Sequence, residues 1–392
     1  MKVFISDIHL TDETTGRHNI HPGDVDAFWN DIQVDGIKAE NIELVILGDF
    51  FDCIRSLKWT GTKQPWVKGN STDQTTIQVV KDILSKNKQV VEKLANYFQG
   101  QITYIVGNHD RLIWRVGKAG DLVAKALNID KKRMTSEYVN ESLGIYGTHG
   151  HDNDEYNKFS PTKREAPIGD AIVTLLINKF PETVGNKMKK PKLRKALQEI
   201  DNLRPAFLAP LWIEYNTKTL TENEAKRVKK IWPELVKDFY ENSFVKNWFD
   251  EYDVWYNPAD KADRLQFAFD YFTDSSAKRL LDRFIEIKND FHKSKDEYLA
   301  GAAKTLRDNA ECMYILHGHT HENALHLLGE QNKKGRFYLN TGTWRRRIVL
   351  GDARKRKPLF SPIKTISYVV VYDKNERAIT GTDFESWNGA IV

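Results

Sequence analysis

The stretch Met1-Lys2-Val3-Phe4-Ile5-Ser6-Asp7-Ile8-His9 joins a short apolar run to an aspartate and a histidine two positions apart. Short runs of β-branched and aromatic residues that end at polar residues are typical of buried strands, so this run predicts a strand over 2–5. Side chains at positions i and i+2 of a strand lie on one face. We therefore expect Asp7 and His9 to point together from the carboxyl end of that strand.

Four further polar clusters each follow an apolar run that predicts a strand, over 43–47, 102–106, 143–147 and 313–316. In chain order, the clusters are Gly48-Asp49-Phe50-Phe51-Asp52, Gly107-Asn108-His109-Asp110, Thr148-His149-Gly150-His151 and Gly318-His319-Thr320-His321. Helical periodicity lies between the early strands, most clearly over 73–98. This alternation predicts an α/β fold with a largely parallel core sheet. Because ligands gather at the carboxyl edge of such sheets, the clusters predict one shared site.

The residue types in these clusters are those that bind divalent metal ions. The expected ligands are Asp7, His9, Asp49, Asn108, His149, His319 and His321. Carboxylate and imidazole together suit Mn²⁺, our first expectation, as well as Fe²⁺ or Zn²⁺. Two ions about 3.5–4 Å apart need a bridging ligand, for which Asp49 is our candidate. Such ions lower the pKa of a shared water, and the resulting hydroxide would attack the phosphorus of a phosphate ester.

Jointly, the five clusters resemble the pattern of the calcineurin-like metallophosphoesterase superfamily, which reads D-x-H, G-D-x-x-D, G-N-H-D/E, a G-H or H-G element, and G-H-x-H. The resemblance covers residues 1–152 and 313–343, and it implies a four-layer α/β/β/α sandwich that binds two metal ions. The implied ligands are Asp7, His9, Asp49 and His321 for the first ion, and Asp49, Asn108, His149 and His319 for the second. It further implies that His109 contacts the scissile phosphate and protonates the leaving oxygen, and that Asp52 orients and charges His109.

Two positions separate the chain from particular branches of that superfamily. Cys53 follows Asp52, where some relatives have arginine, so we do not expect a protein serine/threonine phosphatase. Relatives that cleave the lipid A precursor have arginine at the position of His109, which argues against a close match to them.

Residues 153–308 show helical spacing and many aromatic side chains, but no clear strand. We expect a helical insert here, between core segments 1–152 and 309–392. Aromatic residues at helical spacing usually pack inward, so they predict a core for the insert. An insert between His149 and His319 also starts and ends near the metals, which favours a cap over the site that selects the leaving group.

The composition is typical of a soluble globular protein, with 392 residues, 40% hydrophobic and 29% charged. The net charge of +5 suits an anionic substrate but is too small to argue for nucleic acid by itself. Cys53 and Cys312 lack metal-site spacing and predict two buried reduced thiols. No signal peptide or membrane-spanning segment is apparent, so we expect a cytoplasmic protein, with peripheral membrane contact left open.

Several other residues are candidates for weaker reasons. His151, Arg345 and Arg346 could contact a substrate phosphate, the arginines because they follow the His321 segment. We expect His317 to pack on the sheet, and His18, His21, His292 and His326 to lie on the surface. Basic runs at 187–195, 345–347 and 354–357 predict solvated faces or anion contacts.

The sequence therefore predicts a metal-dependent phosphoric ester hydrolase. The substrate would be a phosphodiester, a pyrophosphate or a phosphomonoester, with a small or lipid-linked nucleotide-like molecule as the leading hypothesis. A nuclease is the alternative within the same chemistry, although nucleic acid is not favoured. A non-catalytic scaffold on the same fold is the alternative from another class. The oligomeric state is not predicted.

Overall fold

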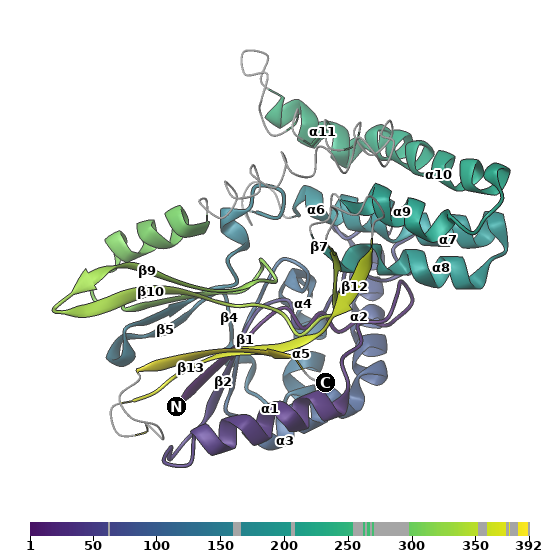
Figure 1. The fold of residues 1–392 in the computed structure, drawn as a ribbon. Coiled ribbons are helices and arrows are strands. Elements are labelled where there is room, and N and C mark those ends of the chain that lie inside the picture. Colours follow the sequence, from purple (N-terminus) through teal and green to yellow (C-terminus); the bar gives the residue numbers. More distant parts are fainter. Residues whose placement is uncertain are drawn as a thin grey trace.

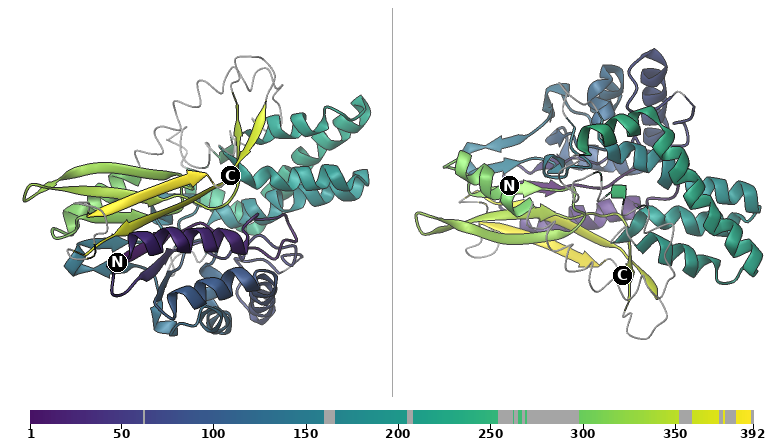
Figure 2. Two further views of the ribbon diagram at one scale, coloured as in Figure 1. Left: turned by 60° about the horizontal axis from the view of Figure 1, so that its bottom comes forward. Right: turned by 90° about the horizontal axis from the view of Figure 1, so that it is seen from above.

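The structure is a computed structural model that describes residues 1–61, 63–159, 166–204, 208–253, 298–351, 359–373 and 383–390, together with residues 262, 265, 266, 269 and 376. Two larger sheets come from the first and last parts of the chain, and helices from its middle gather at one end of them (Figure 1). Figure 2 shows the same separation from two further sides. The mixture of strands and helices confirms the predicted α/β class.

The first sheet has six strands in the order β14-β13-β1-β2-β3-β4. Their bounds are β1 Lys2–Ile5, β2 Glu43–Leu47, β3 Ile102–Ile105, β4 Met134–Thr135, β13 Thr365–Val371 and β14 Phe384–Ala390. Strands β1 to β4 run parallel, whereas β13 is antiparallel to β1 and β14 is antiparallel to β13. The largely parallel sheet that we expected is thus confirmed in β1 to β4, and the antiparallel strands lie at the other edge. Antiparallel neighbours need no crossover helix between them, whereas parallel neighbours do.

The second sheet has five strands in the order β5-β6-β8-β10-β9, with parallel and antiparallel pairs. Its strands are β5 Tyr138–Asn140, β6 Ile145–Gly147, β8 Tyr314–His317, β9 Asn323–Gln331 and β10 Lys334–Thr341. β6 and β8 pair in parallel, with Ile145 opposite Tyr314, although these two residues are 169 positions apart in the chain. This pairing brings the segment after β6 beside the segment after β8.

The third sheet is small, with the order β12-β11-β7. Its strands are β7 Leu203–Arg204, β11 Arg347–Leu350 and β12 Phe360–Ile363. β7 lies inside the stretch for which we expected no strand, so that expectation is wrong at Leu203 and Arg204. A strand of two residues carries no readable periodicity, and β7 exists because β11 pairs with it in parallel.

The two larger sheets share one apolar cluster and are covered by helices on their other faces. Alternate side chains of β1 point to opposite faces, as a strand requires. Phe4 packs in the cluster that joins both sheets, while Val3 and Ile5 pack in the cluster that joins the first sheet to helices. These helices are α1 Pro22–Asp35, α2 Asn70–Lys86, α3 Lys88–Phe98, α4 Arg111–Arg115 and α5 Gly117–Ala126. A helix over 298–308 packs through Ala302 and Leu306 on the second sheet.

The single helix expected over 73–98 is two helices that meet at Asn87. The Asn87 side chain is buried, and its Nδ2 donates to the carbonyl oxygens of Thr11 and Ile83 at 2.9 and 2.8 Å. Asparagine side chains compete with the helical backbone for such hydrogen bonds, which explains the break. The apolar periodicity continues across the break and therefore concealed it.

The described part of the middle of the chain forms helices around an apolar core, to which Ile348 and Phe360 of the last part also belong. The inward packing that the aromatic pattern predicted is confirmed for its described residues. The helices are α6 Ile168–Ala171, the π-helix η4 Ile172–Ile177, α7 Lys179–Met188, α8 Pro191–Leu197, the 3₁₀ helix η5 Gln198–Asn202, α9 Ala209–Thr217, α10 Glu222–Glu241 and α11 Ser243–Tyr252. Trp212, Trp232, Phe239 and Trp248 are buried in this core. Trp255, Phe267, Phe272, Phe284, His292 and the basic run 354–357 lie outside the described residues.

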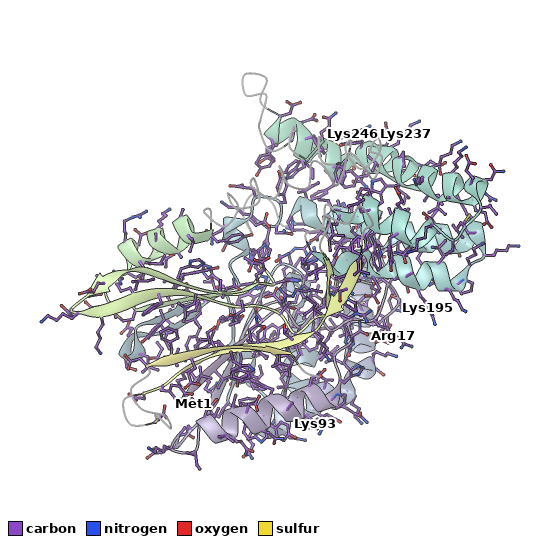
Figure 3. The ribbon with its side chains drawn as sticks, in the orientation of Figure 1. Met1, Arg17, Lys93, Lys195, Lys237 and Lys246 are labelled. Carbon is purple, nitrogen blue, oxygen red and sulfur yellow. The ribbon has the colours of Figure 1, made fainter. Side chains whose placement is uncertain are left out.

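The surface of this helical part is basic in places. Lys195, Lys237 and Lys246 are exposed and extend from its helices (Figure 3). Within the basic run 187–195, Lys187, Lys190 and Arg194 form ion pairs with Glu234, Glu224 and Glu182 at 2.8, 2.9 and 2.7 Å. Among the described residues, no helix is both long and apolar enough to cross a membrane.

The expectations for the cysteines and for the remaining described histidines are confirmed, except for His18. Cys53 and Cys312 are free and buried, as predicted. His317 packs edge-on against Tyr338, with ring centroids 5.4 Å apart. His21 and His326 are exposed, but His18 is only 5% exposed and the surface expectation is wrong for it. The Ile20 amide donates to His18 Nδ1 at 3.0 Å, a short-range contact that sequence spacing did not reveal.

His18 should make the stability of the protein depend on pH. Burial lowers the pKa of His18 to about 4, against the opposing effect of Glu13. Because the folded pKa lies below the unfolded value of about 6.5, the unfolded state binds the proton first and stability falls between pH 6.5 and 4. The loss should be about 3 kcal/mol. Between pH 7 and pH 4, the free energy of unfolding measured with urea should fall by about 3 kcal/mol less in His18→Gln than in the wild type. His326→Gln is the control, and equal losses in all three proteins would contradict the prediction.

Candidate metal centre

Five of the predicted ligands have an uncommon backbone conformation. Asp7, His9, Asp49, His319 and His321 have φ angles of 53°, 51°, 52°, 69° and 59°. Residues other than glycine rarely adopt this left-handed region, and such conformations concentrate at functional sites. The positive φ angles also correct our geometric expectation. Asp7 and His9 lie beyond the end of β1 at Ile5, so loop geometry and not the face of a strand aims their side chains.

Two glycines allow these loops to approach one another closely. A Cβ atom on Gly48 would lie 2.6 Å from Nδ1 of His149, and Gly48 has a φ of 84°. A Cβ atom on Gly107 would overlap Oδ1 of Asp49. Only glycine leaves room at either position. The glycines of the G-D-x-x-D and G-N-H-D clusters therefore have a packing role at the site.

Asp7, His9 and His321 form one group of converging atoms. His321 Nε2 lies 3.0 Å from His9 Nε2 and 3.3 Å from Asp7 Oδ1, and His9 Nε2 lies 3.6 Å from the same oxygen. Asp7, His9 and Asp49 are each at most 1% exposed. His9 Nε2 is also 3.8 Å from Asp49 Oδ2. The structure thus brings together all four ligands that the resemblance implied for the first ion.

The four ligands implied for the second ion also lie together, with Asp49 common to both groups. His149 Nε2 lies 3.1 Å from Asp49 Oδ2 and 3.1 Å from Asn108 Oδ1. His319 completes a second group in which one donor atom each from Asp49, His149 and His319 lies within 4.8 Å of the others. His149 Nδ1 lies 2.7 Å from the Leu47 carbonyl oxygen, to which it donates. That contact leaves the lone pair of Nε2 for a ligand.

Asp52 connects this cluster to His109. Its Oδ2 lies 3.1 Å from His9 Nδ1, and its Oδ1 lies 2.9 Å from His109 Nδ1. Burial raises the pKa of Asp52, but His109 and His9 outweigh burial and hold the pKa well below its usual value. Burial lowers the pKa of His109, but Asp52 and Asp49 raise it to about 10. Both carboxylates therefore favour the protonated imidazole, the form that can give a proton to a leaving oxygen.

The donor set fits divalent cations. Asp7 Oδ1 is buried and accepts no hydrogen bond from any described residue, although two imidazole nitrogens face it. Two facing Nε2 atoms only 3.0 Å apart, beside carboxylates, are an arrangement that a shared cation satisfies. The donors are oxygen and nitrogen without thiolate, since Cys53 contributes no donor to any of the groups formed by described residues. Mn²⁺, Fe²⁺ and Zn²⁺ suit this set.

Asp154 is a site residue that the sequence reasoning missed. Its Oδ2 accepts from His319 Nε2 at 3.0 Å and from Asn157 Nδ2 at 2.8 Å. Asn108 Nδ2 in turn donates to Asn157 Oδ1 at 3.3 Å. A hydrogen-bonded chain therefore joins His319 to Asn108, two of the ligands implied for the second ion. Asp154 lies only five positions after His149, so the polar run His151-Asp152-Asn153-Asp154 was the available signal.

The segment η5–β7 of the helical part also reaches the centre, which no sequence signal indicated. Arg204 Nη2 lies 2.6 Å from His321 Nδ1. The Asp201 carboxylate binds Arg345 at 2.5 Å and lies 3.5 Å from Arg55 Nε. Arg345 Nη1 is 3.9 Å from Asp52 Oδ2, so this predicted substrate residue lies beside the centre.

The other two predicted substrate residues are placed differently. Arg346 pairs with Glu199 at 2.7 Å. His151 is 8% exposed, and its ring centroid lies 5.5 Å from that of His149. It stacks on Phe159 with centroids 4.9 Å apart, so its ring is held by packing.

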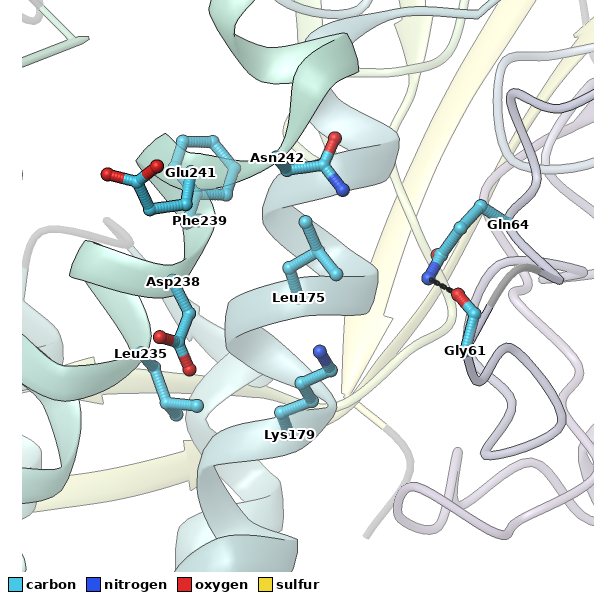
Figure 4. Close-up of a pocket in the computed structure, with 9 residues that line it drawn as sticks. All are labelled: Gly61, Gln64, Leu175, Lys179, Leu235, Asp238, Phe239, Glu241 and Asn242. Atoms are coloured by element: carbon cyan, nitrogen blue, oxygen red, sulfur yellow. Dashed lines mark hydrogen bonds between the residues drawn. The ribbon is translucent and has the colours of Figure 1, made fainter.

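A hollow of about 370 Å³ lies elsewhere, lined by nine residues (Figure 4). Its lining residues are Gly61, Gln64, Leu175, Lys179, Leu235, Asp238, Phe239, Glu241 and Asn242. None of them is a predicted site residue. This hollow therefore adds no residue to the histidine and aspartate cluster.

Comparison with known proteins adds no relative, since no protein-family model matches the chain and no curated protein matches it.

Asp154 should hold His319 in the orientation that binds the second ion. Replacing Asp154 by Asn removes the carboxylate that accepts the imidazole hydrogen, and loss of such a partner typically weakens metal affinity about 10- to 100-fold. Asp152→Asn is the matched control, because the Asp152 side chain is 70% exposed. Calorimetric titration with Mn²⁺ should show one weakened site in Asp154→Asn and two unchanged sites in Asp152→Asn. Identical titrations for the two variants would contradict this role.

Proposed function

We propose that the protein is a metal-dependent phosphoesterase with two divalent ions, built on an α/β/β/α metallophosphoesterase sandwich with residues 153–308 as a helical cap. One observation carries the proposal: five segments distant in sequence bring seven donor residues together, with the buried Asp49 carboxylate among the other six. The apolar cluster between the two larger sheets, with helices on their outer faces, supports the layered architecture. The order and spacing of the five sequence clusters support the assignment to the calcineurin-like superfamily.

The chain's own residues have separable roles in the proposed reaction. When bound, the two ions would supply Lewis acidity and an activated water near neutral pH. Asp49 lies between the two groups of donors and is suited to contact both ions, because its Oδ2 faces His9 and His149. The Asp49 Oδ1 atom accepts from the His109 amide at 2.8 Å, which fixes the carboxylate. A rigid carboxylate keeps the donor groups in one geometry through the reaction.

His109 is the proposed general acid. Its Nδ1 is engaged by Asp52, so Nε2 remains for the leaving oxygen of the substrate. Its side chain is 17% exposed, more than the side chains of His9 and His149, at 1% and 0%. A group that exchanges protons with a substrate must be reachable, and His109 meets this condition better than its neighbours.

The substrate class that we favour is a phosphodiester or pyrophosphate of a small or lipid-linked nucleotide-like molecule. The internal ion pairs of the basic run 187–195 leave that run less suited to a polyanion, so a nuclease is not favoured. A scaffold without catalysis would have no need for the buried, polarised pair of Asp52 and His109.

Removal of the proposed acid should separate catalysis from metal binding. In Mn²⁺-loaded protein, His109→Ala should lower turnover of a phosphodiester with a poor leaving group by about 10²–10⁴-fold. Elemental analysis should still find two ions per chain, because the ligands remain. Turnover of a nitrophenyl ester, whose leaving group needs no proton, should fall much less. His326→Ala, at an exposed position, is the control. Undiminished turnover would remove His109 from this role, and a wild-type protein that is inactive with Mn²⁺ would overturn the enzyme proposal.

A further inference from the structure

Three arginines contact Asp201 beside the metal centre, two through its carboxylate and one through its backbone carbonyl oxygen. Arg345 and Arg55 lie 2.5 and 3.5 Å from Asp201, and Arg204 Nη1 donates to the Asp201 carbonyl oxygen at 2.9 Å. Within the described part of the chain, Arg204 forms no ion pair of its own. Asp52 is the next carboxylate, 3.9 Å from Arg345, but His9 and His109 already engage it. Among these three arginines and Asp201, three positive charges therefore face one negative charge.

The buried guanidinium groups also keep hydrogen-bond donors without acceptors. Arg55 and Arg345 are 2% and 5% exposed. Nη1 of Arg55 and Nε of Arg345 find no acceptor among the described residues. Buried donors are normally satisfied, and charged ones are costly to leave unpaired. An anion at this place would supply both the missing acceptors and the missing negative charge.

The contact between Arg204 and His321 is incompatible with a metal on His321. Arg204 Nη2 lies 2.6 Å from Nδ1, which must accept because a guanidinium can only donate. The same ring presents Nε2 to Asp7 and His9. If Nε2 gives its lone pair to an ion, the ring hydrogen must be on Nδ1, which can then no longer accept. Metal binding should therefore free the Nη2 end of Arg204 for another acceptor close to the ions.

From these contacts we infer that Arg204 and Arg345 form an anion clamp, in which the helical segment η5–β7 binds a phosphate group of the substrate beside the metal centre. The inference rests on the proposed function and narrows its substrate. The fork of a guanidinium matches two phosphate oxygens, and two such groups match a doubly charged phosphate better than a singly charged diester. Among the substrates considered above, such a clamp favours a dianionic phosphate, either a phosphomonoester or the terminal phosphate of a pyrophosphate, over the phosphodiester.

Phosphate binding to Mn²⁺-loaded protein, measured by calorimetry, tests the clamp without relying on turnover. Arg204→Gln should weaken binding of inorganic phosphate about 10- to 100-fold, the loss typical of charge-assisted hydrogen bonds. Binding of dimethyl phosphate, which carries one charge, should change less. Arg227→Gln is the matched control, because Arg227 is an exposed arginine of the same helical part. Arg204→Lys keeps the charge without the fork and should show a smaller loss, which provides a second variant if Arg204→Gln does not fold.

The outcomes separate this inference from the proposed function. Unchanged phosphate binding in Arg204→Gln, with metal content and turnover normal in the wild type, overturns the clamp and leaves the phosphoesterase proposal standing. Loss of metal from Arg204→Gln also overturns the clamp, because the role of Arg204 would then be to hold His321 in place for metal binding. A wild type without metal or turnover refutes the proposed function itself. If pyrophosphate binds more tightly than phosphate and Arg204→Gln removes the difference, the clamp supports a pyrophosphate substrate. If both bind equally and both depend on Arg204, it supports a phosphomonoester.

Discussion

The Asp49 carboxylate is the charge on which the rest of the site depends. It is 1% exposed and lies between histidines from four other segments of the chain. Burial raises the pKa of Asp49, but His149 and His109 outweigh burial and keep the carboxylate ionised. A buried charge must be paired. The partners of Asp49 are the surrounding imidazoles and, when bound, the metal cations. The strained loops around it are held in place by the sheets whose strands end there.

Polar contacts tie the helical part of the chain to this centre. Arg111 pairs with Asp170 at 2.5 Å, and Asn178 Nδ2 donates to the Ile54 carbonyl oxygen at 3.1 Å. Asp201 and Arg204 add contacts to Arg345 and His321. Both partners of the Arg111 pair are almost fully buried, so the loss of either would leave an uncompensated charge. The proposed cap is thus joined to the proposed catalytic core through charged groups and not only through apolar packing.

Much of the architecture was predictable because it depends on local pattern. The strands of Lys2–Ile5 and Glu43–Leu47 have the bounds that the apolar runs predicted, and the polar residues just beyond them meet as expected. What failed depends on contacts between distant residues. The break at Asn87 rests on a hydrogen bond to Thr11, and β7 rests on pairing with β11. The contact between Arg204 and His321 was likewise not predictable, since no residue near Arg204 in the sequence indicates it.

The most direct test of the account is anomalous diffraction from crystals of the protein grown with Mn²⁺. We expect two peaks about 3.5–4 Å apart, with the Asp49 carboxylate between them. His321 should contact the ion on the side of Asp7, and His149 the ion on the side of Asn108. A single peak, or two ions that Asp49 does not bridge, would contradict the central claim.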